Sequence, residues 1–211
     1  AYWRGDEKRP KLQRIYGILF PDQKQLDEYL RLVEEAKKRD HRKLGKAMTL
    51  FSFHQETPGM PFWHHNGLTI MNEVTAYLRQ LLTRESYQEV KTPVLLNQEL
   101  WKRSGHWRNY KDNMYICKID ADKHAVKPMN CPGGLLMFGE KIWSYRELPV
   151  RIAELGLVHR HEKKGVLHGL FRVREFTQDD AHVYCLPNQI QSEVAKIIDL
   201  IREIYAKFGF M

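Results

Sequence analysis

The stretch from His159 to His182 constrains the fold more than any other part of this chain. Two extended segments flank a loop that holds Gly165 and Gly169, which predicts a strand–loop–strand unit. Strand side chains alternate between faces, so Arg160 and Glu162 are expected to point to the same side. A guanidinium binds phosphate oxygens through two N–H groups, and a carboxylate accepts from an exocyclic amine. We interpret the pair as a candidate nucleotide site.

Arg172 and Phe176 follow the loop and extend this interpretation. Arg172 offers a second cation, and Phe176 offers a flat ring on which a base can stack. Catalysis of phosphoryl or adenylyl transfer is largely positioning and charge stabilisation, for which such a set suffices. Each residue taken alone favours a solvated surface hairpin. The ordered combination favours a site.

The composition is that of an ordinary globular protein: 211 residues, 43% hydrophobic and 28% charged. No apolar run approaches the roughly 18 to 20 residues of a membrane helix, and no secretory leader is visible. The net charge of +8 is compatible with a polyanionic partner such as RNA. Cysteines are few and odd in number, which argues against a disulfide framework and predicts a reducing, cytoplasmic location: Cys117, Cys131 and Cys185.

Apolar residues at helical spacing predict three long helices, and short β-rich runs lie between them. The helices are expected over Asp22–Lys38, from Ile70 to Leu81, and over Pro187–Phe208, with a shorter helix after Cys131-Pro132-Gly133-Gly134 through Lys141. Strands are expected over Gln88–Thr92, Asn113–Cys117 and His124–Lys127, and turns at Pro58-Gly59 and Asn66-Gly67. Short strands among unequal helices, without a regular βαβ alternation, favour an α+β fold with an antiparallel sheet.

The segment His159-Arg160-His161-Glu162, followed by Arg172-Val173-Arg174-Glu175-Phe176, resembles motif 2 of class II aminoacyl-tRNA synthetases. Other segments resemble the threonyl-tRNA synthetases specifically, and together they cover nearly the whole chain in a consistent order. These segments are Tyr2-Trp3-Arg4-Gly5-Asp6-Glu7, Arg39-Asp40-His41-Arg42-Lys43, Lys127-Pro128-Met129-Asn130-Cys131-Pro132-Gly133 and Gln178-Asp179-Asp180-Ala181-His182. The resemblance implies a class II antiparallel β-sheet flanked by helices.

The resemblance also implies a zinc site. Cys131 and His182 lie 51 positions apart (182 − 131), so spacing alone favours a buried thiol and a structural histidine. In threonyl-tRNA synthetases the matching residues bind one Zn²⁺ per subunit with a further His, which here would lie outside this chain. Thiolate and imidazole suit Zn²⁺, and three protein ligands leave positions open for threonine's amine and hydroxyl. A site that requires the hydroxyl rejects valine better than an apolar pocket does.

By the same match, Arg160 would hold the α-phosphate of ATP as the catalytic residue, and Glu162 would hold the adenine amino group. Arg172 would reach the outer phosphates, which carry Mg²⁺, and Phe176 would stack on adenine. Three further residues would line the amino-acid pocket, Asp180 facing the substrate ammonium: Met129, Gln178 and Asp180.

The implied organisation is a tail of an upstream editing domain (1–21), a linker helix (22–45) and the N-terminal part of the catalytic domain (46–211). The second long helix with strand Gln88–Thr92 resembles motif 1, which implies a homodimer. The implied partners are ATP, threonine and tRNA(Thr), with no membrane. We also expect Lys163-Lys164 to contribute to tRNA binding.

Two departures from the family pattern stand out. Gly134 occupies a position where the family usually has His, and motif 3 is absent, so the fold is expected to be truncated before motif 3. The 211 residues alone are therefore expected to be weakly active or inactive. Two alternatives stay open: a class II synthetase for another amino acid, and a non-catalytic module that binds RNA or a partner protein.

Overall fold

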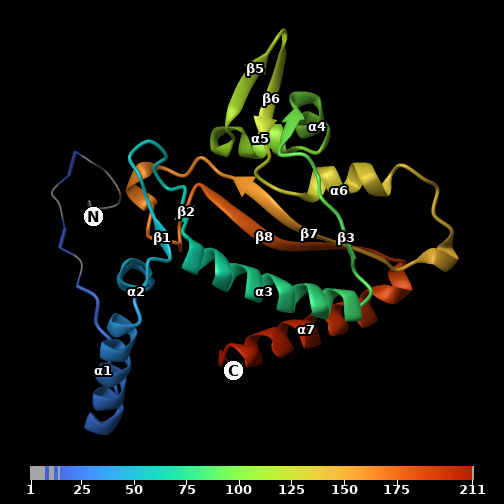
Figure 1. Ribbon diagram of the computed structural model, residues 1–211. Coiled ribbons are helices and arrows are strands. Elements are labelled where there is room, and N and C mark those ends of the chain that lie inside the picture. Colours follow the sequence, from blue (N-terminus) through green and yellow to red (C-terminus); the bar gives the residue numbers. More distant parts are fainter. Residues whose placement is uncertain (1–7, 10–11, 14, 211) are drawn as a thin grey trace. The chain divides into compact units, whose positions relative to one another are not determined.

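The computed structural model describes residues 8–9, 12–13 and 15–210 of the 211-residue chain (Figure 1). The chain forms two compact units, 1–43 and 44–211. The segment Tyr2–Glu7, on which part of the family resemblance rests, lies outside the described residues.

The first unit is built around helix α1 (Gln23–Lys38), as the apolar spacing predicts. Asp22 caps it, since its carboxylate accepts a hydrogen bond from the Gln25 backbone N–H at 2.8 Å. The expected linker helix over 22–45 is interrupted, because α2 (His41–Ala47) begins anew after Asp40. The Asp40 carboxylate accepts from the Arg42 backbone N–H at 2.8 Å, which supports that new start.

The central sheet of the second unit has the strand order β3-β7-β8. Strands β7 (Val150–His159) and β8 (Glu175–Tyr184) pair antiparallel over ten residues each, which confirms the expected strand–loop–strand unit. Strand β3 (Gln88–Glu89) is shorter than expected and runs parallel to β7. The fold class is α+β, as predicted, with one parallel pair in the central sheet.

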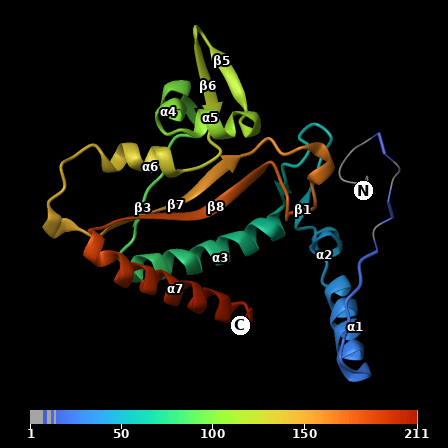
Figure 2. The same cartoon turned by 180° about the vertical axis from the view of Figure 1, so that it is seen from behind.

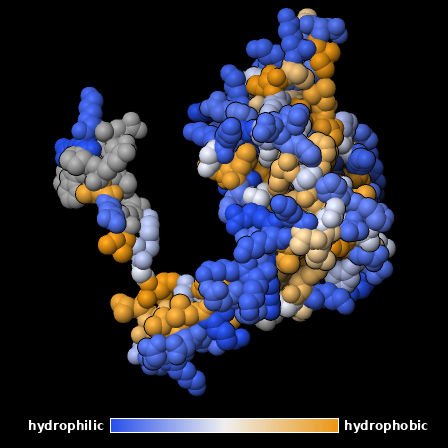
Figure 3. All heavy atoms as spheres, turned by 60° about the vertical axis from the view of Figure 1, so that its left-hand side comes forward, coloured by the Kyte–Doolittle hydropathy of each residue, from blue (hydrophilic) through white to orange (hydrophobic). Residues whose placement is uncertain are grey.

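Helices α3 (His65–Arg84) and α7 (Ile190–Lys207) lie on one side of this sheet, whereas α6 (Cys131–Phe138) lies on the other (Figures 1 and 2). The predicted final helix is preceded by a 3₁₀ turn, Pro187–Gln189, and ends at Lys207, two residues before Gly209, whose φ is +72°. Several apolar side chains of α7 are exposed, among them Val194, Ile198 and Ile201. Figure 3 shows apolar surface in patches between hydrophilic areas on the face that it draws.

A second, smaller sheet lies on the α6 side, with strand order β4-β6-β5 (Figure 1). Its strands are β4 (Leu95–Asn97), β5 (Ile116–Ile119) and β6 (Asp122–Val126), so the strands expected over Asn113–Cys117 and His124–Lys127 are present with shifted ends and form a hairpin. Helices α4 (Gln98–Arg103) and α5 (His106–Tyr110) and the 3₁₀ turn Lys111–Asn113 complete this part. The core here is formed by Trp101, Met114 and Ala125.

A two-stranded hairpin of β1 (Phe51–Ser52) and β2 (Phe62–Trp63) precedes α3, and its turn includes Pro58-Gly59, as predicted. The turn expected at Asn66-Gly67 is wrong, because both residues lie in the first turn of α3. Gly67 instead lets the Leu50 carbonyl oxygen lie close to the helix, because a Cβ at this position would overlap that oxygen. Among the described residues, no helix combines the length and apolar character needed to cross a bilayer.

Candidate functional site

The alternation of side chains along β8 separates a polar site from an apolar cavity. Asp179, Ala181 and Val183 line a cavity of about 240 Å³ against α3 and α7. Burial, and then the negative charge of Asp180, raise the pKa of the Asp179 carboxyl. The alternate residues face the other way, as strand geometry requires. They include four of the predicted site residues: Phe176, Gln178, Asp180 and His182.

A pocket of about 430 Å³ lies at the loop end of β7 and β8, and all four predicted nucleotide residues line it: Arg160, Glu162, Arg172 and Phe176. The Arg160 guanidinium lies over the Phe176 ring, with its Cζ 5.1 Å from the ring centroid. Arg160 Nε also donates to the Pro128 carbonyl oxygen at 3.1 Å. One cation and one aromatic face are therefore held together at the pocket.

Arg160 and Glu162 lie just beyond the end of β7, not within it. The pairing with the neighbouring segment continues there, since the Arg160 N–H donates to the Arg174 carbonyl at 2.9 Å. Glu162 forms an ion pair with Arg172 at 2.9 Å. The two were assigned to different parts of ATP, so binding through both requires this ion pair to open. The Arg172 side chain is 57% exposed, so it is free to turn away from Glu162 toward a ligand.

The pocket has further lining residues that the sequence did not indicate. Two come from the small-sheet part of the unit, Tyr110 and Asn113, and three from the loop between β7 and β8, Leu170, Phe171 and Val173. The Asn113 carbonyl accepts from the His161 N–H at 2.8 Å, which joins that part to the loop. No local sequence signal marks Tyr110 and Asn113, because their position depends on how the two sheets meet.

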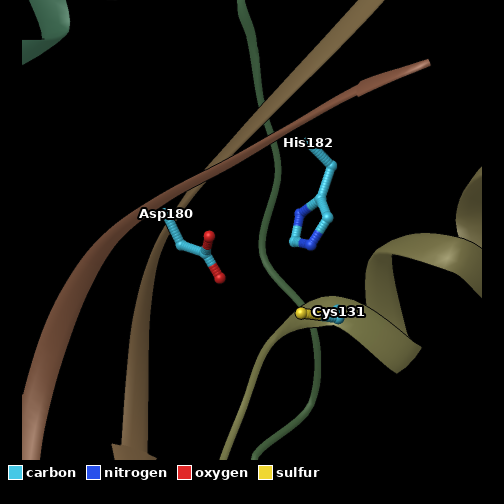
Figure 4. A group of neighbouring side chains, drawn as sticks. All are labelled: Cys131, Asp180 and His182. Carbon is cyan, nitrogen blue, oxygen red and sulfur yellow. The ribbon is translucent and has the colours of Figure 1, made fainter. Parts of the chain in front are cut away.

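Next along β8, Cys131, Asp180 and His182 converge (Figure 4). Their ligand atoms all lie within 4.8 Å of one another, and all three side chains are half-buried. Cys131 comes from the start of α6 and the other two from β8. The structure thus brings together the thiol and imidazole predicted 51 positions apart, with a carboxylate beside them.

The donor set fits a zinc ion. Thiolate and imidazole are among its usual protein ligands, and these two leave positions for a further protein ligand and for substrate. Burial, and then the charge of Asp180, raise the pKa of the Cys131 thiol. A bound cation would reverse this, because a thiol must deprotonate to coordinate a metal. A Cβ on Gly134 would meet only Tyr184 Oη at 3.7 Å and His182 Nδ1 at 4.0 Å, so a side chain there would extend toward His182.

The remaining predicted residues lie around this cluster. The Asp180 carboxylate accepts a hydrogen bond from Asn130 Nδ2 at 3.1 Å. Met129 precedes Asn130, and its Sδ lies 3.2 Å from His106 Nε2. Gln178 shares the face of Asp180 on β8 and pairs in register with Gly156 of β7.

A buried ion pair supports the segment that carries Met129 and Cys131. Lys127 Nζ donates to Glu154 Oε1 at 2.7 Å and to Thr92 Oγ1 at 2.9 Å, and both charged side chains are almost fully buried. Glu154 also accepts from the Thr92 N–H at 2.9 Å. These contacts join β7, the segment after β3 and the segment before α6. No local sequence pattern marks this arrangement.

The chain is similar to known proteins. The model of the tRNA synthetase class II core domain (G, H, P, S and T) matches residues 115–211. The threonine–tRNA ligase of Finegoldia magna is 60% identical over 210 residues, which are 100% of this chain and 33% of that protein. That of Carboxydothermus hydrogenoformans is 58% identical with the same coverage. The chain thus spans about a third of the length of these curated relatives, at 33%.

Two solved structures resemble the fold. The RNA binding domain of threonyl-tRNA synthetase from Cryptosporidium parvum Iowa II has a TM-score of 0.79 and 44% identity, over 81% of this chain and 43% of that one. A Giardia lamblia prolyl-tRNA synthetase in complex with prolyl-adenylate has a TM-score of 0.71 over 79% of this chain and 35% of its own. At 18% identity, the second likeness concerns the fold alone.

Proposed function

Because this chain belongs to the class II aminoacyl-tRNA synthetases, within the threonyl-tRNA synthetase family, we propose that the protein carrying it is a threonine–tRNA ligase. It activates threonine with ATP and transfers the threonyl group from threonyl-adenylate to tRNA(Thr). One observation carries the proposal: the nucleotide pocket and the Cys131–Asp180–His182 cluster adjoin along the same face of β8. An aminoacyl-adenylate needs both kinds of site side by side.

The activation step joins the two sites. An oxygen of the threonine carboxylate attacks the α-phosphorus of ATP, and pyrophosphate leaves with the electron pair of the broken P–O bond. Arg160 binds the α-phosphate and stabilises the charge that builds on it. Phe176 stacks on adenine and Glu162 accepts from its amino group, while Arg172 binds the outer phosphates, which would carry Mg²⁺.

The amino-acid end is held by the other residues. Asp180 faces the substrate ammonium, and Met129 and Gln178 form the pocket walls. Cys131 and His182 would hold Zn²⁺, with a third protein ligand from outside this chain. When bound, the zinc ion supplies a Lewis-acidic position for the amine and hydroxyl of threonine. Requiring the hydroxyl is what separates threonine from valine, which has nearly the same shape.

The homodimer through α3 and β3, the editing-domain tail, the cytoplasmic location and the role of Lys163-Lys164 in tRNA binding stay predictions. The weak activity expected of residues 1–211 alone stays one as well.

Amino-acid-dependent ATP–pyrophosphate exchange by the full-length protein tests the proposal. Threonine should support exchange, serine should support less, and valine should support almost none. Arg160→Gln should abolish exchange, whereas Arg146→Gln should not, because Arg146 is exposed and does not line the pocket. Exchange driven by another amino acid would assign the protein to a different class II specificity. RNA binding with no exchange for any amino acid would favour the non-catalytic module.

A further inference from the structure

Asn130 occupies the N-cap position of α6 but does not cap it. Asparagine is among the residues preferred there, because its side-chain oxygen accepts from the first free N–H groups of a helix. Here the side chain makes no such hydrogen bond. Instead, Nδ2 donates to Asp180 Oδ2 at 3.1 Å, across 50 positions of sequence. The side chain is 2% exposed, so its direction is fixed by the packing around it.

The arrangement leaves the oxygen of the same amide without a hydrogen-bond partner in the part of the chain that the structure describes. Asn130 Oδ1 is buried and has no hydrogen-bond partner among the described residues. A buried acceptor without a partner costs about 1–3 kcal/mol relative to a solvated one. A side chain whose role was only to fill space or to start the helix would not need an amide at this position.

Gly156 provides the space for the amide. It lies in β7, and a Cβ on it would overlap the Asn130 Oδ1 atom. Glycine in the interior of a strand lowers its stability by roughly 0.5–1 kcal/mol, and it often marks a close approach of another group. Three local features that cost stability therefore coincide: an unused cap, an unpaired acceptor and a strand glycine. Their shared result is one hydrogen bond to Asp180.

Within the described part of the chain, Asn130 is the one side chain that donates a hydrogen bond to the Asp180 carboxylate. The Asp180 carboxylate lies against Cys131 and His182, so its orientation decides which oxygen faces the cluster. A carboxylate on a strand otherwise rotates about its terminal torsion within a broad well. An amide N–H on one oxygen selects one orientation and leaves the second oxygen available.

We propose that Asn130 is a positioning residue of the amino-acid site, which fixes the Asp180 carboxylate so that it receives the ammonium group of the substrate. Gly156 contributes to the same arrangement, because it leaves room for the amide. The inference rests on the proposed function and extends it to two residues that do not touch the substrate. It predicts that the amide serves threonine binding and contributes nothing to the stability of the fold.

Asn130→Ser in the full-length protein separates these two effects. Serine removes the amide and its unpaired acceptor, and it can cap α6, so the melting temperature should stay unchanged or rise. The KM for threonine in ATP–pyrophosphate exchange should rise about tenfold to hundredfold, as expected for the loss of a hydrogen bond to a charged group. The KM for ATP should change by less than about twofold, since the nucleotide pocket is untouched.

Two companion variants complete the test. Gly156→Ala displaces the amide without changing its chemistry, so it should raise the threonine KM in the same direction. Asn188→Ser, at an exposed position of the turn before α7, should alter neither KM.

Each outcome decides the inference. An unchanged threonine KM in Asn130→Ser removes it and leaves the proposed function intact. A fall in melting temperature of more than about 5 °C would assign Asn130 to the fold and also removes it. Absence of threonine-dependent exchange in the unchanged protein removes the proposed function and the inference together.

Discussion

Replacing Lys127 by Met should destabilise the second unit strongly, although the two side chains have similar length. Lys127 is 1% exposed and Glu154 is 5% exposed, so the substitution leaves a carboxylate buried without its cation. Breaking a buried pair in this way costs about 3–5 kcal/mol. Glu154 keeps two hydrogen bonds from Thr92, through the backbone N–H and the hydroxyl, both at 2.9 Å. We therefore expect the lower end, about 3 kcal/mol.

Thermal unfolding measures this loss. For a domain of this size 1 kcal/mol shifts the melting temperature by about 2–4 °C, so Lys127→Met should lower it by about 6–12 °C. The double variant Lys127→Met, Glu154→Gln should recover a large part of the loss, because glutamine carries no charge and still accepts from the Thr92 N–H. Lys118→Met, at an exposed position of β5, should shift stability by less than about 0.5 kcal/mol.

Either of two results would contradict this role of the ion pair between Lys127 and Glu154. If Lys127→Met is as stable as the Lys118→Met control, the ion pair does not hold this region together. If the double variant is no more stable than the single one, the cost does not come from an unpaired buried charge.

Three further predictions concern other parts of the unit. Burial raises the pKa of Glu193, but hydrogen bonds from Lys196 and Arg151 outweigh it and hold that pKa below its ordinary range. The stability that ionised Glu193 contributes is present above the ordinary pKa of a glutamate and is lost as the pH falls through the lowered pKa of the folded state. The difference in free energy of unfolding between the unchanged protein and Glu193→Gln, measured by urea unfolding, should therefore shrink below about pH 4.3. A difference that stays constant with pH would contradict this. Gly67→Ala should cost about 1–3 kcal/mol in the same assay despite the better helix propensity of alanine, because its Cβ overlaps a backbone oxygen, and a stabilised variant would refute the close approach. Phe176→Ala should raise the KM for ATP about fivefold to hundredfold in pyrophosphate exchange and leave the threonine KM unchanged, whereas an unchanged ATP KM would remove the stacking role.

The sequence predicts the helices and the β7–β8 hairpin because both depend on local periodicity. Helix α1 begins where Asp22 caps it, and the final helix ends at Lys207, just before Gly209, as such residues usually dictate. The turn prediction at Asn66-Gly67 was wrong, because a contact in the tertiary structure and not a turn requires this glycine. Gly67 is needed for the approach of the Leu50 carbonyl, and that contact is invisible in a local sequence pattern.

The site was predictable only where a motif could be matched. Cys131 and His182 come together because α6 and β8 adjoin, and the family resemblance, not their spacing, indicated the pair. The contacts of Asn130 with Asp180 and Gly156 span three elements and match no local pattern. Long-range contacts of this kind position the site, and they follow from the fold as a whole.

The absorption spectrum of the protein with Co²⁺ in place of zinc tests the central claim most directly. The claim predicts one bound metal per chain and a thiolate-to-metal charge-transfer band. That band should disappear in Cys131→Ser and persist in Cys117→Ser and Cys185→Ser, and threonine, but not valine, should shift the visible bands. A charge-transfer band that survives Cys131→Ser, or that depends on one of the other two cysteines, would contradict the account.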